Sequence, residues 1–442
     1  MTDAQLDVVV VGGGLAGLAA AWALRDRDVL VLEAAERVGG RIRSEPRGDL
    51  WLNFGAHVFA GPDSASGRLI EEAGVRAEPV PGALAALALG DRVVAGGMVE
   101  TYPLRLPLSL RSRVALARAG ARVRLAVRRY AAVAAERPGE DAATRQQRIL
   151  DFDDDHSFTD FIGPLPADVD AIFRATLNRS SGEPEELAAG YGIGYFHLVW
   201  DRSGGLSRNV LGGSARLTDA LAAGVQGRIR TGADVSEVRD AGDRVVVRYR
   251  HDGSEHEVDA QAAVVATPAF VTAAIVAGLP PETAAALASV RYGPYVVGAF
   301  LVDEGTPLPW AGLYALATPG RSFSMLFNTA NVLRRGGSLM VYAAAGGARA
   351  LDSLDDEEVR VRFLADLEAL FPGTRELVRE AVVHRWERGL PYAAVGRARL
   401  QAALTLPLGR VYLAGDYLGT RYTETAAQTA ADAARSVRER LR

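Results

Sequence analysis

The sequence contains no cysteine and no lysine, and these two absences remove several kinds of chemistry. Without cysteine there is no disulfide, no thiolate metal site, no cysteine nucleophile and no cysteinyl bond to a cofactor. Without lysine all 50 basic residues are arginine, so Schiff-base chemistry and a lysine general base are excluded as well. The lack of disulfides leaves the redox compartment open.

Other signatures are also missing. There is no G-x-S-x-G elbow, no H-E-x-x-H and no Walker loop, and the 6 histidines lack the spacing of metal ligands. The net charge of −4 gives no reason to expect nucleic acid. Residues 8–24 carry no charge, but successive glycines interrupt them and they fall short of the roughly 20 residues of a spanning helix. We therefore expect a cytoplasmic protein.

What the sequence does contain is a strand, a glycine-rich turn and a helix at its beginning, LDVVVVGGGLAGLAAAWAL. In this pattern Gly12 lets the backbone turn, Gly14 lets it approach a pyrophosphate and Gly17 lets the helix pack on the strand. The first helical residues, Leu15 and Ala16, offer free N–H groups to an anion. The sequence therefore predicts a dinucleotide-binding unit.

An acidic residue and a second glycine turn follow. Glu33 closes the second strand 21 residues after Gly12, where a carboxylate accepts hydrogen bonds from a ribose, and Ala34 comes next. Gly39 and Gly40 then precede Arg41, which brings a cation near the first phosphate loop. This second turn suits an extended cofactor with two phosphates rather than an ordinary nicotinamide dehydrogenase.

Residues 50–59 (LWLNFGAHVF) predict a strand in which Gly55 and Ala56 let the backbone lie against a flat ring. His57 and Phe59 flank that approach. His57 is equally well interpreted as a partly buried structural histidine or as a group with a chemical role.

Two later stretches complete the pattern. Residues 244–258 predict a hairpin turned by Asp252 and Gly253, followed by the buried strand of AVVATP. Near the end of the chain, residues 411–414 predict a short strand, Gly415 and Asp416 a turn, and residues 425–437 an alanine-rich helix.

These motifs together resemble the FAD-dependent superfamily of flavin amine oxidases, protoporphyrinogen oxidases and carotenoid desaturases. The resemblance implies noncovalent FAD, with Val235 contacting the adenine through its backbone and Thr267 on the strand that returns to the flavin. It implies that Asp416 meets the pyrophosphate or ribityl chain. It also implies that the amides near Thr425 and Ala426 face the flavin O2, where a helix N-terminus stabilises negative charge on the reduced ring.

The fold that the resemblance implies is α/β. A Rossmann-like FAD-binding domain of the glutathione-reductase type is interleaved with an α+β substrate domain that contains an antiparallel sheet and a helical insertion. The FAD-binding domain is expected to comprise residues 1–60, 205–275 and 395–442, and the substrate domain residues 61–204 and 276–394, with its helical part at about 105–200.

Within that insertion, residues 109–130 form an arginine-rich amphipathic segment. Such a helix could meet a membrane surface peripherally, steer an acidic substrate, or present an ordinary solvated face, which is the interpretation we favour.

The substrate is defined less clearly. Amine oxidases of this superfamily usually carry a lysine that reaches flavin N5 through a water, and this chain has none. Tyr422 matches one wall of their aromatic cage, whereas the opposite wall falls near Arg397 or Ala398, so the cage is incomplete. Trp386 and Tyr392 resemble the protoporphyrinogen-oxidase pattern instead, although Trp386 is equally well interpreted as core packing.

We therefore predict an FAD-dependent oxidoreductase that removes a hydride from a C–N or C–C bond of a mostly apolar small molecule, with O2 as acceptor. A neutral amine needs no protein base, which makes the missing lysine tolerable. The candidate catalytic residues are His57, Tyr422, Trp386, Tyr392 and Arg397, the last as an anchor for a carboxylate or carbonyl. The composition suggests a bacterial biosynthetic enzyme. A homodimer is one assembly that the sequence leaves open.

Two alternatives stay open. One is a porphyrinogen-oxidase-like or carotenoid-desaturase-like enzyme. The other is a non-redox enzyme similar to UDP-galactopyranose mutases, which the His57-x-Phe59 pattern resembles.

Overall fold

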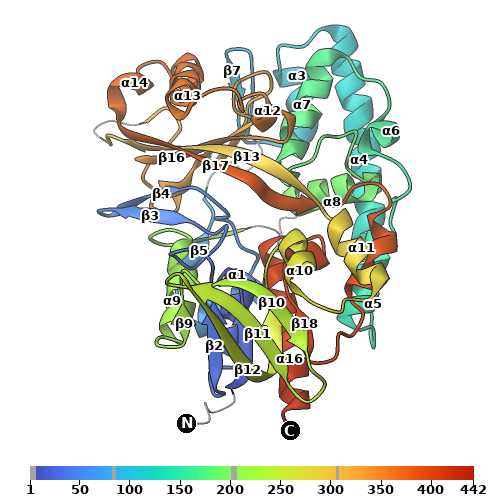
Figure 1. Cartoon of the computed structure of the whole chain (residues 1–442). Coiled ribbons are helices and arrows are strands. Elements are labelled where there is room, and N and C mark those ends of the chain that lie inside the picture. The colour runs from blue at the N-terminus through green and yellow to red at the C-terminus, as the bar shows by residue number, and fades with distance from the viewer. Residues whose placement is uncertain (1–5, 82–85, 201–206, 305–307) are drawn as a thin grey trace.

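The computed structural model describes residues 6–81, 86–200, 207–304 and 308–442. Two large sheets dominate these residues, and Figure 1 shows one lying above the other with a group of helices along one side. The predicted boundary between residues 204 and 205 lies outside the described residues.

The first sheet contains the predicted dinucleotide-binding unit. Its order is β10-β11-β12-β1-β2-β9, with β18 paired to β12. Strand β1 is parallel to its two neighbours, β2 and β12. Its side chains are buried on both faces, as is usual for parallel strands: Val8 and Val10 lie in one core, Val9 and Val11 in another. The strands are β1 Leu6–Val11, β2 Val29–Leu32, β9 Ile229–Arg230, β10 Asp234–Asp240, β11 Val245–His251, β12 Ser254–Val265 and β18 Val411–Leu413.

The predicted hairpin is confirmed in this sheet. Strands β11 and β12 are joined by Asp252 and Gly253, which have φ angles of 49° and 74°. Two successive residues with positive φ form the turn that matches the twist of a hairpin. The C-terminal half of β12 then runs parallel to both β1 and β18 and so brings the last part of the chain beside the first.

Helices α1 (Leu15–Ala23), α9 (Ala215–Ala223) and α16 (Thr423–Arg440) share one core with β1. Helix α2 (Ala65–Glu72) contributes Leu69 and Ile70 to the same core, although the sequence assigned residues 61–204 to the other domain. Small residues explain the tight packing of α1 on β1, because a Cβ at Gly17 would lie 1.8 Å from the carbonyl oxygen of Gly12.

The second sheet has the order β17-β13-β16-β15-β14-β6-β7 and is antiparallel except between β14 and β6. Because side chains alternate along a strand, Val297 and Tyr342 face one core while Phe300 and Val341 face another that includes helix α13. Its strands are β6 Ala86–Leu89, β7 Arg92–Val94, β13 Arg291–Val302, β14 Ala315–Ala317, β15 Met325–Asn328, β16 Ser338–Ala344 and β17 Val378–Tyr392.

The predicted helical insertion lies beside this sheet in Figure 1. The arginine-rich segment forms α4, capped by the Ser109 hydroxyl, which accepts from the Ser112 amide. The insertion comprises α3 Tyr102–Arg105, α4 Leu110–Ala134, α5 Ala142–Leu150, α6 Phe158–Ile162, α7 Ala167–Leu177 and α8 Ala189–Trp200. The remaining helices are α10 Ala269–Ile275, α11 Pro281–Ser289, α12 Gly346–Arg349, α13 Asp356–Leu370, α14 Thr374–Leu377 and α15 Gln401–Leu404.

Two small antiparallel pairs form separate two-stranded sheets: β3 (Ser44–Arg47) with β4 (Leu50–Asn53), and β5 (Ala77–Pro79) with β8 (Arg208–Val210). The prediction of one strand over residues 50–59 is wrong beyond Asn53. The chain leaves the strand because Gly55 passes close to the backbone of Arg41, where a Cβ at Gly55 would lie 2.1 Å from the Arg41 carbonyl oxygen. This close backbone contact by itself requires glycine at this position, and the approach of a flat ring to Gly55 stays a prediction.

Candidate active site

The glycine turn after β1 forms an anion cradle. Gly12 has a φ of +102°, which favours glycine. Gly14 is the N-cap of α1, and no side chain caps this helix. A Cβ at Gly14 would meet nothing within 4 Å. The open space and the uncapped N–H groups of Leu15 and Ala16 make the turn a site for a phosphate group.

The predicted acid stands next to this cradle. The Glu33 carboxylate accepts from the Gly13 amide at 2.5 Å and from the Ala35 amide at 2.9 Å, so the glycine turn and the backbone after β2 both hold it. A carboxylate has about four acceptor positions, which leaves Glu33 capacity for ribose hydroxyls.

The second glycine turn lies against the first, as predicted. The Gly39 amide donates to the Gly13 carbonyl at 2.8 Å, and Gly14 and Gly39 form an isolated parallel bridge. Gly40 has a φ of +54°, and a Cβ there would lie 3.2 Å from the Gly14 Cα. The two turns thus present one continuous backbone surface.

Arg41 joins three distant parts of the chain beside this surface. Its guanidinium pairs with the Asp416 carboxylate at 2.8 Å and donates to the Gly389 carbonyl of β17 at 3.2 Å. Burial acts to lower the pKa of Arg41, but the ion pair with Asp416 outweighs it and the pKa is raised. Asp416 follows Gly415, whose amide donates to the Thr429 hydroxyl of α16 at 3.0 Å.

The start of α16 differs in part from the expectation. Tyr422 is its N-cap, with φ 55° and no side-chain cap. The Thr425 hydroxyl accepts from the Arg421 amide at 2.9 Å, but the Ala426 amide donates to the Tyr422 carbonyl at 3.0 Å. The expectation that the Ala426 amide is free to face a flavin is therefore wrong, because the helix itself uses it.

Several aromatic side chains lie near the N-terminus of α16, where Tyr422 is the N-cap. The hydroxyls of Tyr422 and Tyr191 are hydrogen-bonded at 3.2 Å, with their rings edge to face. The Trp386 indole donates to the Phe54 carbonyl at 2.6 Å, and Trp386, which lies on β17, pairs with Tyr295 of β13. Burial raises the pKa of both Tyr422 and Tyr191, so neither hydroxyl is a base at neutral pH.

His57 belongs to the same group. Its Nδ1 lies 3.1 Å from the Gly55 carbonyl oxygen, and its ring meets Phe327 edge to face at 4.7 Å. Because a carbonyl only accepts, Nδ1 carries the proton and Nε2 is left as a buried acceptor with no partner among the described residues. Burial lowers the pKa of His57 to about 4, and nearby Arg179 adds to this effect.

Two further predicted catalytic residues have partners within the chain. Arg397 is buried, and its Nη2 donates to the Gln401 side chain at 2.9 Å and to the Tyr417 carbonyl at 2.8 Å. Its Nη1 has no partner among the described residues, so its role as a substrate anchor stays a prediction. Tyr392 pairs with Arg291 at the end of β17 and packs where a Cβ on Gly182 would fall. Tyr392 is also buried in the core against which Trp386 and Tyr422 pack, so its catalytic role stays a prediction.

Two predicted cofactor residues belong to the first sheet. Val235 on β10 is buried in the core that contains Val9 and Leu32. The Thr267 methyl lies close to Gly12, 3.4 Å from where a Cβ would be, and its hydroxyl is 2.8 Å from that of Thr272. Thr267 thus borders the phosphate loop directly.

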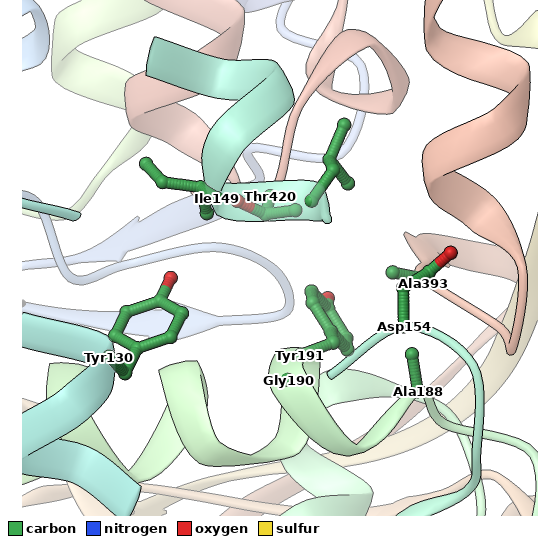
Figure 2. Close-up of a pocket in the computed structure, with 9 residues that line it drawn as sticks. Tyr130, Ile149, Asp154, Ala188, Gly190, Tyr191, Ala393 and Thr420 are labelled. Carbon is green, nitrogen blue, oxygen red and sulfur yellow. The ribbon is translucent and has the colours of Figure 1, made fainter. Parts of the chain in front are cut away.

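A small pocket lies behind the Tyr191 and Tyr422 pair. Figure 2 shows Tyr130 and Tyr191 rising from α4 and α8 toward Ile149 and Thr420. Its volume is about 10 Å³, which is room for one water and not for a substrate.

The structure also brings in residues that the sequence did not reveal. Arg179, Tyr191, Tyr195, Tyr295 and Tyr342 all reach the aromatic group from α8, the turn after α7, and the second sheet. No local motif marks them, since only the tertiary packing of separate insertions assembles them.

Within the described ranges, no group of three or more histidine or acidic side chains is arranged to hold a metal ion. No helix in the part of the chain that the structure describes combines the length and apolar character needed to cross a bilayer.

The fold and the site define a nucleotide-binding α/β protein with a packed group of aromatic side chains. We call this group of Tyr422, Tyr191, Trp386, His57 and Phe327 the aromatic chamber. The sequence profile of the family described as flavin containing amine oxidoreductase matches residues 15–438, so the chain belongs to this family. It is an FAD-dependent oxidoreductase in class, and FAD is its cofactor.

Individual relatives agree with this assignment. The chain is 39% identical over 75 residues to the probable flavin-containing monoamine oxidase A of Dictyostelium discoideum, 16% of each chain. It is 41% identical over 71 residues to protoporphyrinogen oxidase 2 of Arabidopsis thaliana, covering 16% of this chain and 14% of that protein. These matches thus span less than a fifth of either relative.

Similarity of fold extends over the whole chain. The structure of cyclohexylamine oxidase from Brevibacterium oxydans IH-35A matches with a TM-score of 0.79 at 19% identity, covering 99% of both chains.

Proposed function

We propose that this protein uses FAD to oxidise the C–N bond of a small amine and passes the electrons to O2. The observation that carries the proposal is the aromatic group of Tyr422, Tyr191 and Trp386, which lies at the start of α16 beside the Asp416 and Arg41 pair. The family supplies the cofactor, and the aromatic group supplies an apolar chamber for a substrate.

The residues present fit FAD. The open cradle at Gly14 suits the pyrophosphate, Glu33 suits a ribose, and Arg41 with Asp416 suits the middle of the cofactor. When bound, FAD supplies a flavin N5 that accepts a hydride from the carbon next to the substrate nitrogen. The chain contributes orientation, an apolar surround and a fixed electrostatic setting.

The pKa values of the nearby side chains determine whether the substrate amine must be neutral or charged when it reacts. His57 has a pKa of about 4, and burial raises the pKa values of Tyr422 and Tyr191, so none of the three takes a proton from an ammonium group near pH 7. With no lysine in the chain, the amine enters the reaction already neutral. His57 Nε2 is placed to accept one N–H of such an amine.

Several finer features belong to the same proposal. We assign the Rossmann-like domain to residues 1–60, 205–275 and 395–442. We also propose that the substrate is mostly apolar, that the protein is a cytoplasmic bacterial tailoring enzyme, and that it assembles as a homodimer. The apolar core around Phe327 and Tyr342 supports the apolar body.

The test is anaerobic mixing of the FAD-loaded protein with three probes: benzylamine, a porphyrinogen and dithionite. Bleaching of the flavin absorption by benzylamine supports the proposal. Bleaching by the porphyrinogen alone replaces it with porphyrinogen oxidation. Bleaching by dithionite alone contradicts both and directs attention to the non-redox alternative.

A further inference from the structure

Arg179 is a cation in the aromatic chamber without an acidic partner. It lies in the short 3-10 turn Asn178–Ser180 that follows α7, and its guanidinium carbon sits 5.4 Å from the Tyr195 ring centre and 5.2 Å from that of Phe327. Among the residues that the structure describes, no carboxylate pairs with it. By contrast Arg174, on α7, pairs with Asp170, Glu183 and Glu185.

Such a cation is costly unless something compensates it. Burial acts to lower the pKa of Arg179, but the nearby Tyr195 and Tyr314 and a hydrogen bond with the Tyr342 side chain outweigh it and the pKa is raised, so the group stays charged. The two aromatic faces give cation–π attraction, but a guanidinium has five N–H donors and aromatic rings satisfy these poorly.

Unsatisfied polar atoms surround the same place. The hydroxyl of Tyr195 and the Nε2 of His57 are buried without a hydrogen-bond partner among the described residues, and the buried hydroxyl of Tyr314 has only the Asn209 side chain beside it. They lie together, because the Tyr314 ring is 5.8 Å and the His57 ring 4.7 Å from the ring of Phe327, over which Arg179 stands. Buried polar atoms are normally paired, so a cluster of orphans points to an absent ligand.

The orphan atoms also have complementary chemistry. Arg179, Tyr195 and Tyr314 offer N–H and O–H donors, which suit the two oxygens of a carboxylate. His57 Nε2 offers an acceptor, which suits the N–H of an amine. The Arg179 carbonyl accepts from the Tyr295 hydroxyl at 2.6 Å, and Tyr295 and Tyr422 pack against the same apolar core, so Arg179 and Tyr422 border one group of side chains.

We propose that Arg179 binds a carboxylate of the substrate, so that the preferred substrate is an amine with a carboxylate a few bonds from its nitrogen. This inference rests on the proposed amine oxidation for the identity of the second group, but the anion site itself does not depend on turnover. The tyrosine hydroxyls complete the anion site, and the aromatic faces hold the body of the molecule.

The first test measures binding without chemistry. The FAD-loaded protein is titrated with benzoate and with neutral, isosteric benzamide, and the shift of the flavin absorption gives each Kd. Benzoate should bind at least about tenfold more tightly than benzamide, since a charge-assisted pair distinguishes them. Arg179→Gln should remove that preference, whereas Arg174→Gln, which alters an arginine already paired with acids, should keep it.

Equal wild-type affinities for the two probes would overturn the inference, and so would a benzoate preference that survives in Arg179→Gln. The wild-type comparison holds even if Arg179→Gln fails to fold. In that case Arg179→Lys, which keeps the charge but lacks the planar guanidinium with its paired N–H donors, should weaken the preference for benzoate.

The second test separates this inference from the proposed function. L-Phenylalanine and 2-phenylethylamine share an amine and a ring but differ in the carboxylate. Faster anaerobic reduction by phenylalanine, lost in Arg179→Gln, supports both proposals. Reduction by both at equal rates overturns the carboxylate site alone. If neither reduces the flavin while benzoate binding still depends on Arg179, amine oxidation fails and the anion site stands.

Discussion

His57 links the chamber to the stability of the fold. Its pKa is about 4 in the folded chain against about 6.5 in an unfolded one, so folding favours the neutral ring. This contribution to the free energy of unfolding is complete above pH 6.5 and is lost as pH falls toward 4.

We expect the unfolding free energy to drop between pH 7.5 and pH 5, and to drop less in His57→Asn, which cannot titrate. Urea unfolding of both proteins at the two pH values measures the difference. His384 has a pKa of about 4 for a similar reason, burial, and remains in both proteins, so it cancels in the comparison. An identical pH response in both proteins would refute the buried neutral state of His57.

Substitution of Tyr422 tests whether its ring helps to position the substrate. Its ring is held by the Tyr191 hydroxyl and by an N-cap backbone with φ 55°. We expect Tyr422→Ala to slow flavin reduction by roughly tenfold to hundredfold with FAD still bound, because substrate orientation is lost. Tyr422→Phe keeps the ring and should stay close to the wild-type rate. Unchanged single-turnover rates in Tyr422→Ala would place this side chain outside the reaction.

At the scale of elements, the β1–turn–α1 unit separates two roles of glycine. Gly17 is required for folding, because a Cβ there would lie 1.8 Å from the Gly12 carbonyl oxygen. Gly14 has an ordinary φ of −76° and open space around it, so alanine fits the empty chain but intrudes into the phosphate cradle.

Gly14→Ala should therefore fold with wild-type stability and lose FAD affinity by about tenfold or more, whereas Gly17→Ala should lose about 3 kcal/mol or more of stability. Thermal unfolding of the FAD-free proteins and FAD titration distinguish the two. A Gly14→Ala protein with full FAD affinity would show that the cofactor does not approach this turn.

Local patterns explain which elements were predictable. The uninterrupted apolar run of β1, the glycine spacing of the turn and the Asp252-Gly253 hairpin are short-range signals, and each formed the predicted element. Residues 50–59 failed because the end of β4 depends on contact with the Arg41 backbone, which no local pattern encodes. The partners of Arg397 and Tyr392 could not be predicted, because they depend on how separate segments of the chain pack together.

At the scale of the whole molecule, Arg41 and Asp416 join the start of the chain to its end, and Arg41 also reaches β17 of the second sheet. Asp416→Asn keeps the size of the side chain but leaves the Arg41 charge without its partner. We expect lower FAD occupancy and a loss of about 1–3 kcal/mol in stability.

The ratio of flavin to protein absorbance and urea unfolding measure these two effects. Glu72→Ala, at an exposed position of α2, is the matched removal of a carboxylate and should change neither. Full yellow colour in Asp416→Asn would remove the cofactor role assigned to this residue.

The chamber itself is a property of the whole molecule. Tyr422 comes from the last helix, His57 from the loop after β4, and Arg179 from the helical insertion. Sequence reasoning identified Tyr422 and His57 because each lies beside a cofactor motif. Arg179 has no such neighbour, so only the assembled fold reveals it.

Because the chain has no lysine, we expect it to oxidise an amine that enters already neutral. This is tested by the anaerobic rate of flavin reduction across pH for two amines whose own pKa values differ by a unit or more. We expect the rate to rise with pH and its midpoint to move with the pKa of the amine. A midpoint that stays fixed for both amines would show a titrating protein base, and no reduction by either amine would contradict amine oxidation altogether.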